Sequence, residues 1–443
     1  MKKVITYGTF DLLHFGHIRL LERAKQLGDY LIVGITSDDY DKTRGKINVQ
    51  QSLSERVAAV RATGLADKIV VEEYEGQKID DIKKYKVDIF TVGSDWVGKF
   101  DYLNAYCTVK YLDRTKGISS SELRQKDRNL TMGVVGDIPK AINKFQSEDK
   151  YVNGICITGV CSKNIENMNE AIQKLEFNTD KYSKLLKNTD SIYINTDLDK
   201  HYELITKALN EGKHVLCESP ICDDDKQAKE LFKLAKQKNL ILMEAIKTAY
   251  STAYQRLILL VKAGKIGNVV SIDAVCTDMS RADQDDYKVK SFQNWGPNAL
   301  LPIFQLLGTN YKDYRIITHF NDKEKTQDSF TKIDFVYENA TASIKVAEGA
   351  KSEGELIITG TKGYIYVPAP WWKTDYFEIR YENIKNNKRF FYQLDGEGIR
   401  YELVSFAKSV QGKEKADNIE ENVSLAISKM AMNLKDKKKL IEI

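Results

Sequence analysis

The chain has 443 residues, of which 42% are hydrophobic and 29% charged, and its formal net charge is +4 at pH 7. This length predicts two or three domains, and the absence of a long single-sign run excludes a charged nucleic-acid-binding arm. Because no apolar run reaches the length of a membrane span and the N-terminus has no signal-peptide pattern, we expect a cytoplasmic protein with no nucleic-acid partner. The six cysteines form no CxxC pair, so we expect neither a disulfide framework nor a metal held by the protein.

The most informative stretch is GTFDLLHFGH, residues Gly8–His17, which follows a strand pattern at Val4–Tyr7 and precedes a helix pattern at Ile18–Leu27. His14 and His17 are three residues apart, so they share one face of the first helical turn. Backbone N–H groups and the helix dipole favour an anion at a helix start. The arrangement predicts a site for a nucleotide triphosphate, and two satisfied structural histidines are the alternative.

Short apolar runs alternate with helix patterns through the rest of the first 130 residues. Strands are predicted at Tyr30–Ile35, Lys68–Val71, Asp88–Val92 and Thr108–Tyr111, and helices at Ser54–Thr63 and Lys78–Lys84. This alternation predicts an α/β domain with a parallel sheet, in which ligands bind at the carboxyl ends of the strands. Basic and hydroxyl side chains follow the predicted strands at Lys42–Lys46 and Arg114–Ser121 and suit phosphate oxygens.

This segment resembles the glycerol-3-phosphate cytidylyltransferase family of HxGH nucleotidyltransferases. The resemblance is carried by GTFDLLHFGH, by GKFD at Gly98–Asp101 and by RTKGIS at Arg114–Ser119. It implies a Rossmann-like parallel sheet over residues 1–130 and a reaction of CTP with sn-glycerol 3-phosphate that gives CDP-glycerol and diphosphate, for teichoic-acid-like or capsule polymers. Adenylyltransferases also contain HxGH, but GKFD and RTKGIS favour the cytidylyl branch. A non-enzymatic binding module is the other alternative.

The resemblance also implies roles for single residues. The catalytic set would be His14, His17, Lys46 and Arg114, which would hold the triphosphate and stabilise its charge during an in-line attack. The nucleotide pocket would include Thr9, Phe10, Asp11, Gly16, Asp95, Thr115, Gly117, Ile118 and Ser119. Asp11 and Asp95 would orient either Mg²⁺-bound nucleotide or the ribose. Arg44 and Lys78 would bind the incoming phosphate, and another polyol phosphate is an alternative acceptor because the loop 41–53 departs from the family pattern.

The second segment begins after a polar joint at Lys126–Leu130 and contains two kinds of pattern. Alternating strands and helices predict a second Rossmann-type domain at 131–248, with strands at Met132–Gly136, Gly154–Val160, Ser191–Asn195 and His214–Cys217, and helices at Ile165–Leu175, His201–Glu211 and Lys226–Lys238. Residues 249–443 read as an α+β domain with an antiparallel sheet between Val269 and Val367 and a helix at Ile419–Leu434.

This second segment resembles the glucose–fructose oxidoreductase and inositol dehydrogenase family. The resemblance is carried by GKHVLCESP at Gly212–Pro220, MEA at Met243–Ala245, GKIG at Gly264–Gly267 and GTKGYIYVPAPWW at Gly360–Trp372. It implies NAD or NADP as cofactor and a sheet domain that often mediates oligomers, so we expect a homo-oligomer. The candidate cofactor-binding residues are Gly136, Glu218, Pro220 and Lys247.

Three positions depart from that family's pattern. The glycine-rich fingerprint has Ile138 in place of its second glycine, and a side chain there would obstruct a dinucleotide. Ser219 replaces the lysine of the family's Glu-Lys-Pro triplet, and the expected Asp and His are absent from Ala299–Phe304. Two hypotheses follow: a non-catalytic scaffold, or a reductase for a keto-sugar or keto-triose phosphate in which Lys247 substitutes for the missing lysine.

Overall fold

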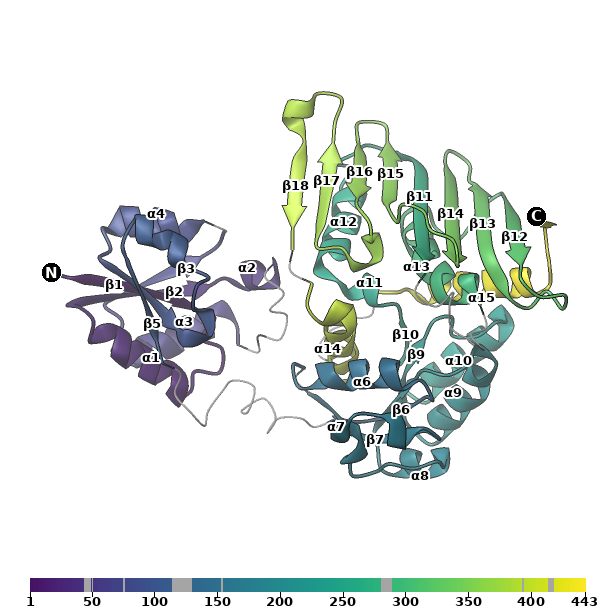
Figure 1. Ribbon diagram of the computed structural model, residues 1–443, viewed down its shortest axis with the longest axis horizontal. Coiled ribbons are helices and arrows are strands. Elements are labelled where there is room, and N and C mark those ends of the chain that lie inside the picture. Colours follow the sequence, from purple (N-terminus) through teal and green to yellow (C-terminus); the bar gives the residue numbers. More distant parts are fainter. Residues whose placement is uncertain are drawn as a thin grey trace. The chain divides into compact units, whose positions relative to one another are not determined.

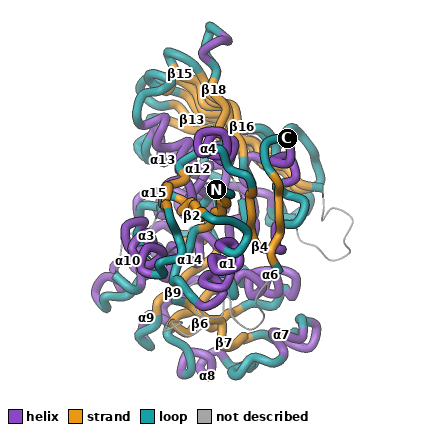
Figure 2. The backbone as a smooth tube through the Cα atoms, turned by 90° about the vertical axis from the view of Figure 1, so that its left-hand side faces the viewer, coloured by secondary structure: helices purple, strands orange, loops and turns teal. Residues whose placement is uncertain are grey.

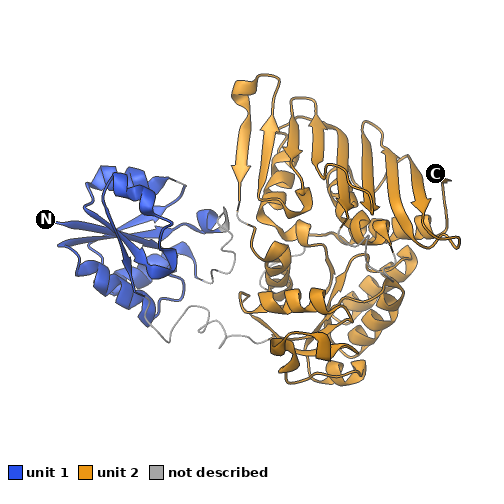
Figure 3. Cartoon of the chain, in the orientation of Figure 1, with its two compact units in different colours: residues 1–127 blue, residues 128–443 orange. Residues whose placement is uncertain are grey.

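The computed structural model describes residues 1–43, 49, 51–74, 76–113, 130–152, 154–279, 289–392, 394–412 and 418–443. The chain divides into two compact units, Met1–Asp127 and Arg128–Ile443 (Figure 3). No helix in the described ranges is both long enough and apolar enough to cross a membrane.

The first unit is built on a five-stranded parallel sheet with the order β3-β2-β1-β4-β5 (Figure 1). Its strands are β1 (Lys3–Gly8), β2 (Tyr30–Thr36), β3 (Lys68–Glu72), β4 (Ile89–Gly93) and β5 (Thr108–Leu112). Its helices are α1 (Phe15–Lys25), α2 (Asp38–Thr43), α3 (Leu53–Ala62), α4 (Gln77–Tyr85) and the 3₁₀ turns η1 (Ser94–Trp96) and η2 (Asp101–Ala105).

Alternating side chains of the central strand β1 enter two separate cores. Val4 packs with Leu21 of α1 and Val60 of α3, whereas its neighbour Ile5 packs with Ile82 of α4. Successive residues of a strand point to opposite faces of the sheet, so α1 and α3 cover one face and α4 covers the other. Both faces are therefore buried, and the carboxyl ends of the strands remain for a ligand.

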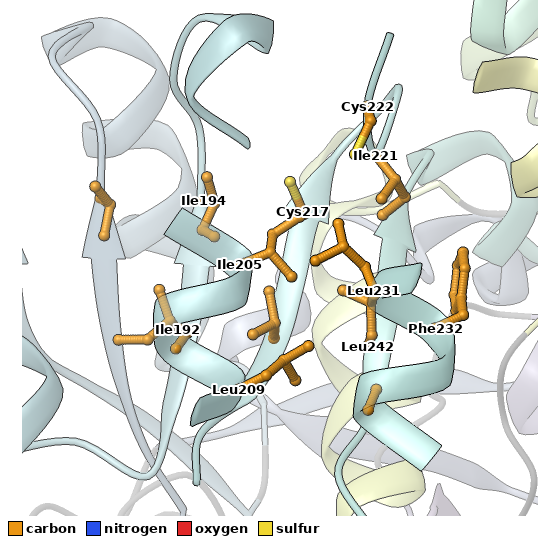
Figure 4. Close-up of a cluster of buried hydrophobic side chains, with 14 of the residues drawn as sticks. Ile192, Ile194, Ile205, Leu209, Cys217, Ile221, Cys222, Leu231, Phe232 and Leu242 are labelled. Atoms are coloured by element: carbon orange, nitrogen blue, oxygen red, sulfur yellow. The ribbon is translucent and has the colours of Figure 1, made fainter. Parts of the chain in front are cut away.

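The second unit begins with another five-stranded parallel sheet, in the order β10-β9-β8-β6-β7. Its strands are β6 (Leu130–Val135), β7 (Ile155–Cys161), β8 (Ser191–Ile194), β9 (His214–Glu218) and β10 (Leu242–Ala245). The connecting helices are α6 (Pro139–Asp149), η3 (Ile165–Asn167), α7 (Glu170–Gln173), α8 (Tyr182–Lys187), η4 (Leu198–Lys200), α9 (His201–Asn210), α10 (Asp225–Gln237) and α11 (Lys247–Tyr250). Figure 4 shows Leu209 of α9 and Leu231 of α10 in the core with Ile192 of β8.

A nine-stranded sheet completes the second unit, in the order β18-β17-β16-β15-β11-β14-β13-β12-β19. Figure 1 shows β18 to β12 side by side, and Figure 2 shows the same strands in a view turned by 90°. Its strands are β11 (Val269–Asp278), β12 (Asp313–Phe320), β13 (Asp328–Val336), β14 (Thr341–Glu348), β15 (Leu356–Gly360), β16 (Tyr364–Val367), β17 (Tyr376–Arg380), β18 (Lys388–Phe391) and β19 (Leu440–Glu442). The accompanying helices are α12 (Thr252–Lys262), α13 (Ser291–Leu307), α14 (Ile399–Val410), α15 (Glu421–Lys435) and the turns η5 (Trp371–Lys373), η6 (Ile384–Asn386) and η7 (Gly396–Gly398).

The helices join the two sheets of the second unit. α13 packs against β11, β13 and β14, and α15 packs against both α13 and α10. α14 returns to the parallel-sheet part, where it packs against α6 and α11. This return brings Glu402 of α14 close to Tyr193 of β8 and to Glu218 at the end of β9.

The predicted fold class is confirmed: two parallel, Rossmann-like sheets precede an α+β domain with a largely antiparallel sheet. Two strand pairs of the large sheet, β11 with β14 and β12 with β19, are nevertheless parallel. The helix predicted at Ile165–Leu175 is wrong, because the segment forms η3 and α7 as separate short turns. Asn169 between them caps α7 by accepting the N–H of Ile172 at 2.9 Å, and such a cap marks a helix start.

Candidate active site

The loop Gly8–His17 joins the carboxyl end of β1 to α1. Two of its residues, Phe10 and Leu12, have positive φ angles of 52° and 48°, which side chains rarely adopt and which cluster at functional sites. The Phe10 ring is 1% exposed and folds back over Gly8, where an added Cβ would lie 3.0 Å from the ring. The loop is thus held in a compact, strained conformation by its own buried ring.

His14 and His17 meet on this loop. Their rings stack with centroids 3.9 Å apart and an interplanar angle of 19°. The Phe10 ring lies edge-to-face with the His17 ring, and the centroids of these two rings are 5.5 Å apart. His14 is the N-cap of α1, and its Nδ1 accepts the backbone N–H groups of Gly16 at 3.1 Å and His17 at 3.4 Å. Since Nδ1 is an acceptor, a neutral His14 carries its proton on Nε2.

This cap changes how the helix start can hold an anion. The sequence predicted that backbone N–H groups of the first turn would contribute, but His14 takes the N–H groups of Gly16 and His17. The remaining ring donor of a neutral His14 is its Nε2–H, at the positive end of the helix dipole. A stacked pair of imidazoles beside a positive helix end suits phosphate oxygens.

A buried arginine that the sequence reasoning missed ties the strand ends together. Arg56 of α3 is fully buried and donates to the carbonyls of Thr9 at 2.8 Å and Thr36 at 2.9 Å. Its Nε donates to the Gln51 carbonyl at 3.1 Å, and Asp38 and Asp41 provide its ion pairs. The guanidinium fork thus joins the ends of β1 and β2 to the segment before α3.

The side chains of Thr9 and Asp11 take part in the same scaffold. The Thr9 hydroxyl donates to Asp41 at 3.0 Å, and the Asp11 carboxylate accepts the Gln51 N–H at 3.0 Å. Thr9 is 9% exposed and Asp11 5% exposed. Both side chains therefore shape the loop from within, and a ligand would meet mainly their backbone.

Asp95 lies in η1, directly after β4, and is exposed. β4 pairs in parallel with β1, so Asp95 and the histidine loop are at the same edge of the sheet. Seven other predicted residues lie outside the described part of the chain: Arg44, Lys46, Arg114, Thr115, Gly117, Ile118 and Ser119.

Lys78, predicted to bind the incoming phosphate, is buried at the start of α4. It is 8% exposed and forms an ion pair with Glu72 at the end of β3. Its ammonium lies 4.7 Å from the centre of the Tyr7 ring and 5.6 Å from that of Phe100. The lysine charge is thus close to the carboxyl edge but is balanced by a carboxylate.

Tyr7 is positioned by a glycine on the neighbouring strand. Gly34 of β2 is paired with Tyr7, and a Cβ at Gly34 would lie 2.1 Å from the Tyr7 ring. In the space that glycine leaves, the Tyr7 hydroxyl reaches Asp81 at 2.8 Å. Burial and the Asp81 carboxylate raise the pKa of Tyr7, so the phenol stays protonated and donates.

In the second unit, the predicted cofactor residues lie along the carboxyl edge of its parallel sheet. Gly136 follows β6, and a Cβ there would lie 2.3 Å from the carbonyl oxygen of Asn195. Glu218 ends β9 and accepts the Tyr193 hydroxyl, and the Pro220 carbonyl contacts Nδ1 of His201 at 2.9 Å. Lys247 begins α11 just after β10.

The serine that replaces the family's lysine has a structural partner. The Ser219 hydroxyl donates to the carboxylate of Glu244, which is 1% exposed. The Ser219 hydroxyl therefore provides a hydrogen-bond partner for a buried carboxylate. Lys247 is the lysine at this edge that the sequence predicted as a substitute for the missing one. Glu402 of α14, which the sequence reasoning missed, is also buried here. No three His, Cys, Asp or Glu side chains gather into a metal site within the described ranges.

Comparisons with known proteins agree with this geometry. A family model described as "Cytidylyltransferase-like" matches residues 5–126. The glycerol-3-phosphate cytidylyltransferases of Bacillus spizizenii and Bacillus subtilis are 49% and 48% identical over 130 residues, which cover 29% of this chain and all of each relative. The chain belongs to the glycerol-3-phosphate cytidylyltransferase family through its first unit. This cytidylyltransferase unit therefore makes the protein a nucleotidyltransferase.

A second family model, "Oxidoreductase family, NAD-binding Rossmann fold", matches residues 131–246. The fold of the second unit is similar to a 3-ketoreductase from Actinomadura kijaniata, solved with NADP and TDP-benzene, with a TM-score of 0.62 at 17% identity. The match covers 71% of this chain and 99% of that one. The cytidylyltransferase unit is thus fused to a domain of the oxidoreductase family.

Proposed function

We propose that the first unit joins CTP to glycerol 3-phosphate and releases diphosphate, with CDP-glycerol as product. The stacked His14–His17 pair carries this proposal, because it presents imidazole donors at the carboxyl edge where the triphosphate would lie. The acceptor phosphate would attack the α-phosphate in line, so positioning and charge stabilisation suffice. The matches to two glycerol-3-phosphate cytidylyltransferases, at 49% and 48% identity over the whole length of each relative, support the substrate assignment.

The remaining roles follow from the same placement and from the family resemblance. His14 and His17 would stabilise charge on the phosphates, with Lys46 and Arg114 neutralising the triphosphate. Phe10 and the Thr9 backbone would line the nucleotide pocket. The other residues that the resemblance assigns to this pocket are Asp11, Gly16, Asp95, Thr115, Gly117, Ile118 and Ser119. Mg²⁺ would enter with CTP, because it needs only phosphate oxygens, water and one or two carboxylates. The exposed Asp95 is better placed for this than Asp11, which is buried.

The experiment combines the full chain with CTP, Mg²⁺ and a panel of polyol phosphates, and it measures diphosphate release. We expect release with CTP and glycerol 3-phosphate, and little with ATP or without an acceptor. Preference for ATP would favour the adenylyltransferase alternative. If the folded protein released no diphosphate with any combination of nucleotide and polyol phosphate, only the binding-module alternative would remain.

We further propose the organisation of the whole chain: a cytidylyltransferase domain at 1–130, a dinucleotide-type domain at 131–248 and an α+β domain at 249–443, assembled as a homo-oligomer. The activated glycerol phosphate of the product suits the synthesis of teichoic-acid or capsule polymers. Light scattering of the full chain measures the assembly, and a monomer at micromolar concentration would contradict it.

We also propose that the second unit takes NAD or NADP at the loop after β6. Ile138, where the sequence predicts an obstruction, has extended backbone (φ −98°, ψ 99°) and a 54% exposed side chain, so a bound dinucleotide would have to turn this side chain aside. Asp137 accepts the Lys163 N–H at 2.9 Å and the Ser162 hydroxyl at 3.0 Å, which ties the loop to the end of β7. Gly136 and the start of α6 would hold the dinucleotide, which supplies a hydride when bound.

A further inference from the structure

Four polar side chains meet at the carboxyl edge of β8, β9 and β10: Tyr193, Glu218, Lys247 and Glu402. We refer to them as the edge cluster. Tyr193 donates its hydroxyl to Glu218 and stacks on Phe145 with ring centroids 3.7 Å apart. Glu402 interacts electrostatically with both Glu218 and Lys247. These side chains come from two strand ends and two helices, and ligands of parallel α/β sheets bind at such an edge.

Glu402 is the unusual member of the edge cluster. Its side chain lies on α14 and is 1% exposed, and both carboxyl oxygens are buried without a hydrogen-bond partner in the described part of the chain. Burial raises the pKa of Glu402 well above its usual range, and the Glu218 charge raises it further. The nearby Lys247 charge lowers this pKa, but burial is the larger effect and favours the protonated carboxyl group, which has an O–H to donate. Buried polar groups nearly always have partners, so the Glu402 carboxyl group is a candidate contact for a ligand.

Lys247 supplies a second donor beside it. Its ammonium forms no hydrogen bond or ion pair with the residues that the structure describes, although it lies half-buried at the start of α11. α11 is packed closely on the turn before α14, since a Cβ at Gly398 would lie 3.1 Å from the Lys247 Cβ. The packing fixes the backbone from which the lysine extends. Lys247 and a protonated Glu402 thus place two donor groups at one edge of the sheet.

We propose that Lys247 and Glu402 bind the carbonyl oxygen of a ketone, and that Lys247 protonates this oxygen as the ketone is reduced by NADH or NADPH. The carbonyl carbon gains a hydride from the reduced nicotinamide, whose C–H bond breaks. The π electron pair of the carbonyl forms the new O–H bond with the Lys247 proton. An alcohol, oxidised nicotinamide and a neutral lysine result, and the lysine regains its proton from water.

The substrate class follows from the proposed function of the first unit. Reduction of a keto-triose phosphate at its central carbon gives a glycerol phosphate, which is the acceptor proposed for cytidylyl transfer. The second unit would therefore supply the first with its substrate. This assignment of the ketone rests on the proposed function, whereas the roles of Lys247 and Glu402 do not.

The first test follows ketone reduction by the full chain as the loss of nicotinamide absorbance, with dihydroxyacetone phosphate, hydroxyacetone and a keto-pentose phosphate as probes. Lys247→Met should lower kcat at saturating NADPH by about 10²-fold or more, and fluorescence titration of NADPH establishes the saturating concentration for each variant. Glu402→Gln keeps a neutral donor and should raise the ketone KM less than tenfold. Glu402→Leu has no donor and should raise the ketone KM more than tenfold. Lys229→Met, at an exposed position of α10, is the matched control.

The second test needs no turnover. Amine-reactive labelling with mass spectrometry compares Lys247 with Lys229 in the presence of NADP⁺, with and without dihydroxyacetone phosphate. We expect the ketone to slow labelling of Lys247 at least fivefold and to leave Lys229 unchanged. Equal labelling, absence of NADPH binding by the folded chain, or full activity of Lys247→Met would each overturn the proposal. Diphosphate release by the same variants reports the first unit independently.

Discussion

Removal of the buried Arg56 guanidinium is the sharpest test of how the nucleotide loop is held. Its fork serves three backbone carbonyls at 2.8–3.1 Å and lies between two aspartates. Breaking a buried ion pair from one side costs about 3–5 kcal/mol, and each stranded carbonyl adds about 1–3 kcal/mol. Arg56→Met should therefore cost at least about 6 kcal/mol, a large part of the about 5–15 kcal/mol that holds a domain together.

The more informative variant is Arg56→Lys. It keeps the charge but cannot reach all three carbonyls with one ammonium, so we expect a loss of about 2–3 kcal/mol. Because the Thr9 carbonyl is one of the three, the loop should also shift, and diphosphate release should fall tenfold or more.

The assay is hydrogen exchange of peptides from β1 and β2 in the full chain, together with turnover. Arg61→Lys, an exposed position on the same helix, is the control and should change neither. Adding Asp41→Asn to Arg56→Met should recover part of the loss, because it removes the stranded charge. A loss below about 1 kcal/mol for Arg56→Met, with normal turnover, would refute the reasoning; such a loss is typical of an exposed ion pair.

Three further predictions address single groups. His17→Ala should lower kcat/KM for CTP by about 10²-fold at an unchanged melting temperature, and a diphosphate assay showing less than tenfold would contradict the site. Lys78→Met should raise the acceptor KM at least tenfold and leave the CTP KM within twofold. If the added substitution Glu72→Gln restored the acceptor KM, the Lys78–Glu72 ion pair would have only a structural role. Burial raises the pKa of Asp328 from 3.8 to about 7. Between these two pH values the folded state therefore binds a proton that the unfolded state does not. The free energy of unfolding should fall by up to about 4 kcal/mol as pH rises through this window, and urea unfolding of Asp328→Asn, which mimics the neutral form, should lack that fall.

The parallel strands could be predicted because a strand buried on both faces reads as a continuous apolar run. Tyr30–Ile35, for example, was predicted within one residue of β2 (Tyr30–Thr36). β17 (Tyr376–Arg380) and β18 (Lys388–Phe391) were missed. They lie at one end of the large sheet, where exposed Lys388 and Arg389 interrupt the apolar pattern. Charged and short strands are typical of sheet edges, and they give a weak signal in sequence.

The histidine pair could be predicted because its spacing is local, whereas Arg56 and Glu402 depend on contacts between distant segments. Arg56 did leave one signal: it lies on the same helical face as Leu53, Val57 and Val60, which is the apolar face. Glu402 left none that its own helix could reveal, since its neighbours in space, Glu218 and Lys247, lie more than a hundred residues earlier in the chain. Buried charges are rare enough that sequence reasoning starts by assuming exposure.

The close approach of Tyr7 to Gly34 has a practical meaning for enzyme engineering. A methyl group at this interior position would push the phenol ring away from Asp81 and remove the aromatic surface beneath the Lys78 ammonium. A buried strand residue without a side chain would then alter substrate range from a distance. Mutant libraries aimed at new acceptors should therefore sample the sheet interior as well as the pocket wall.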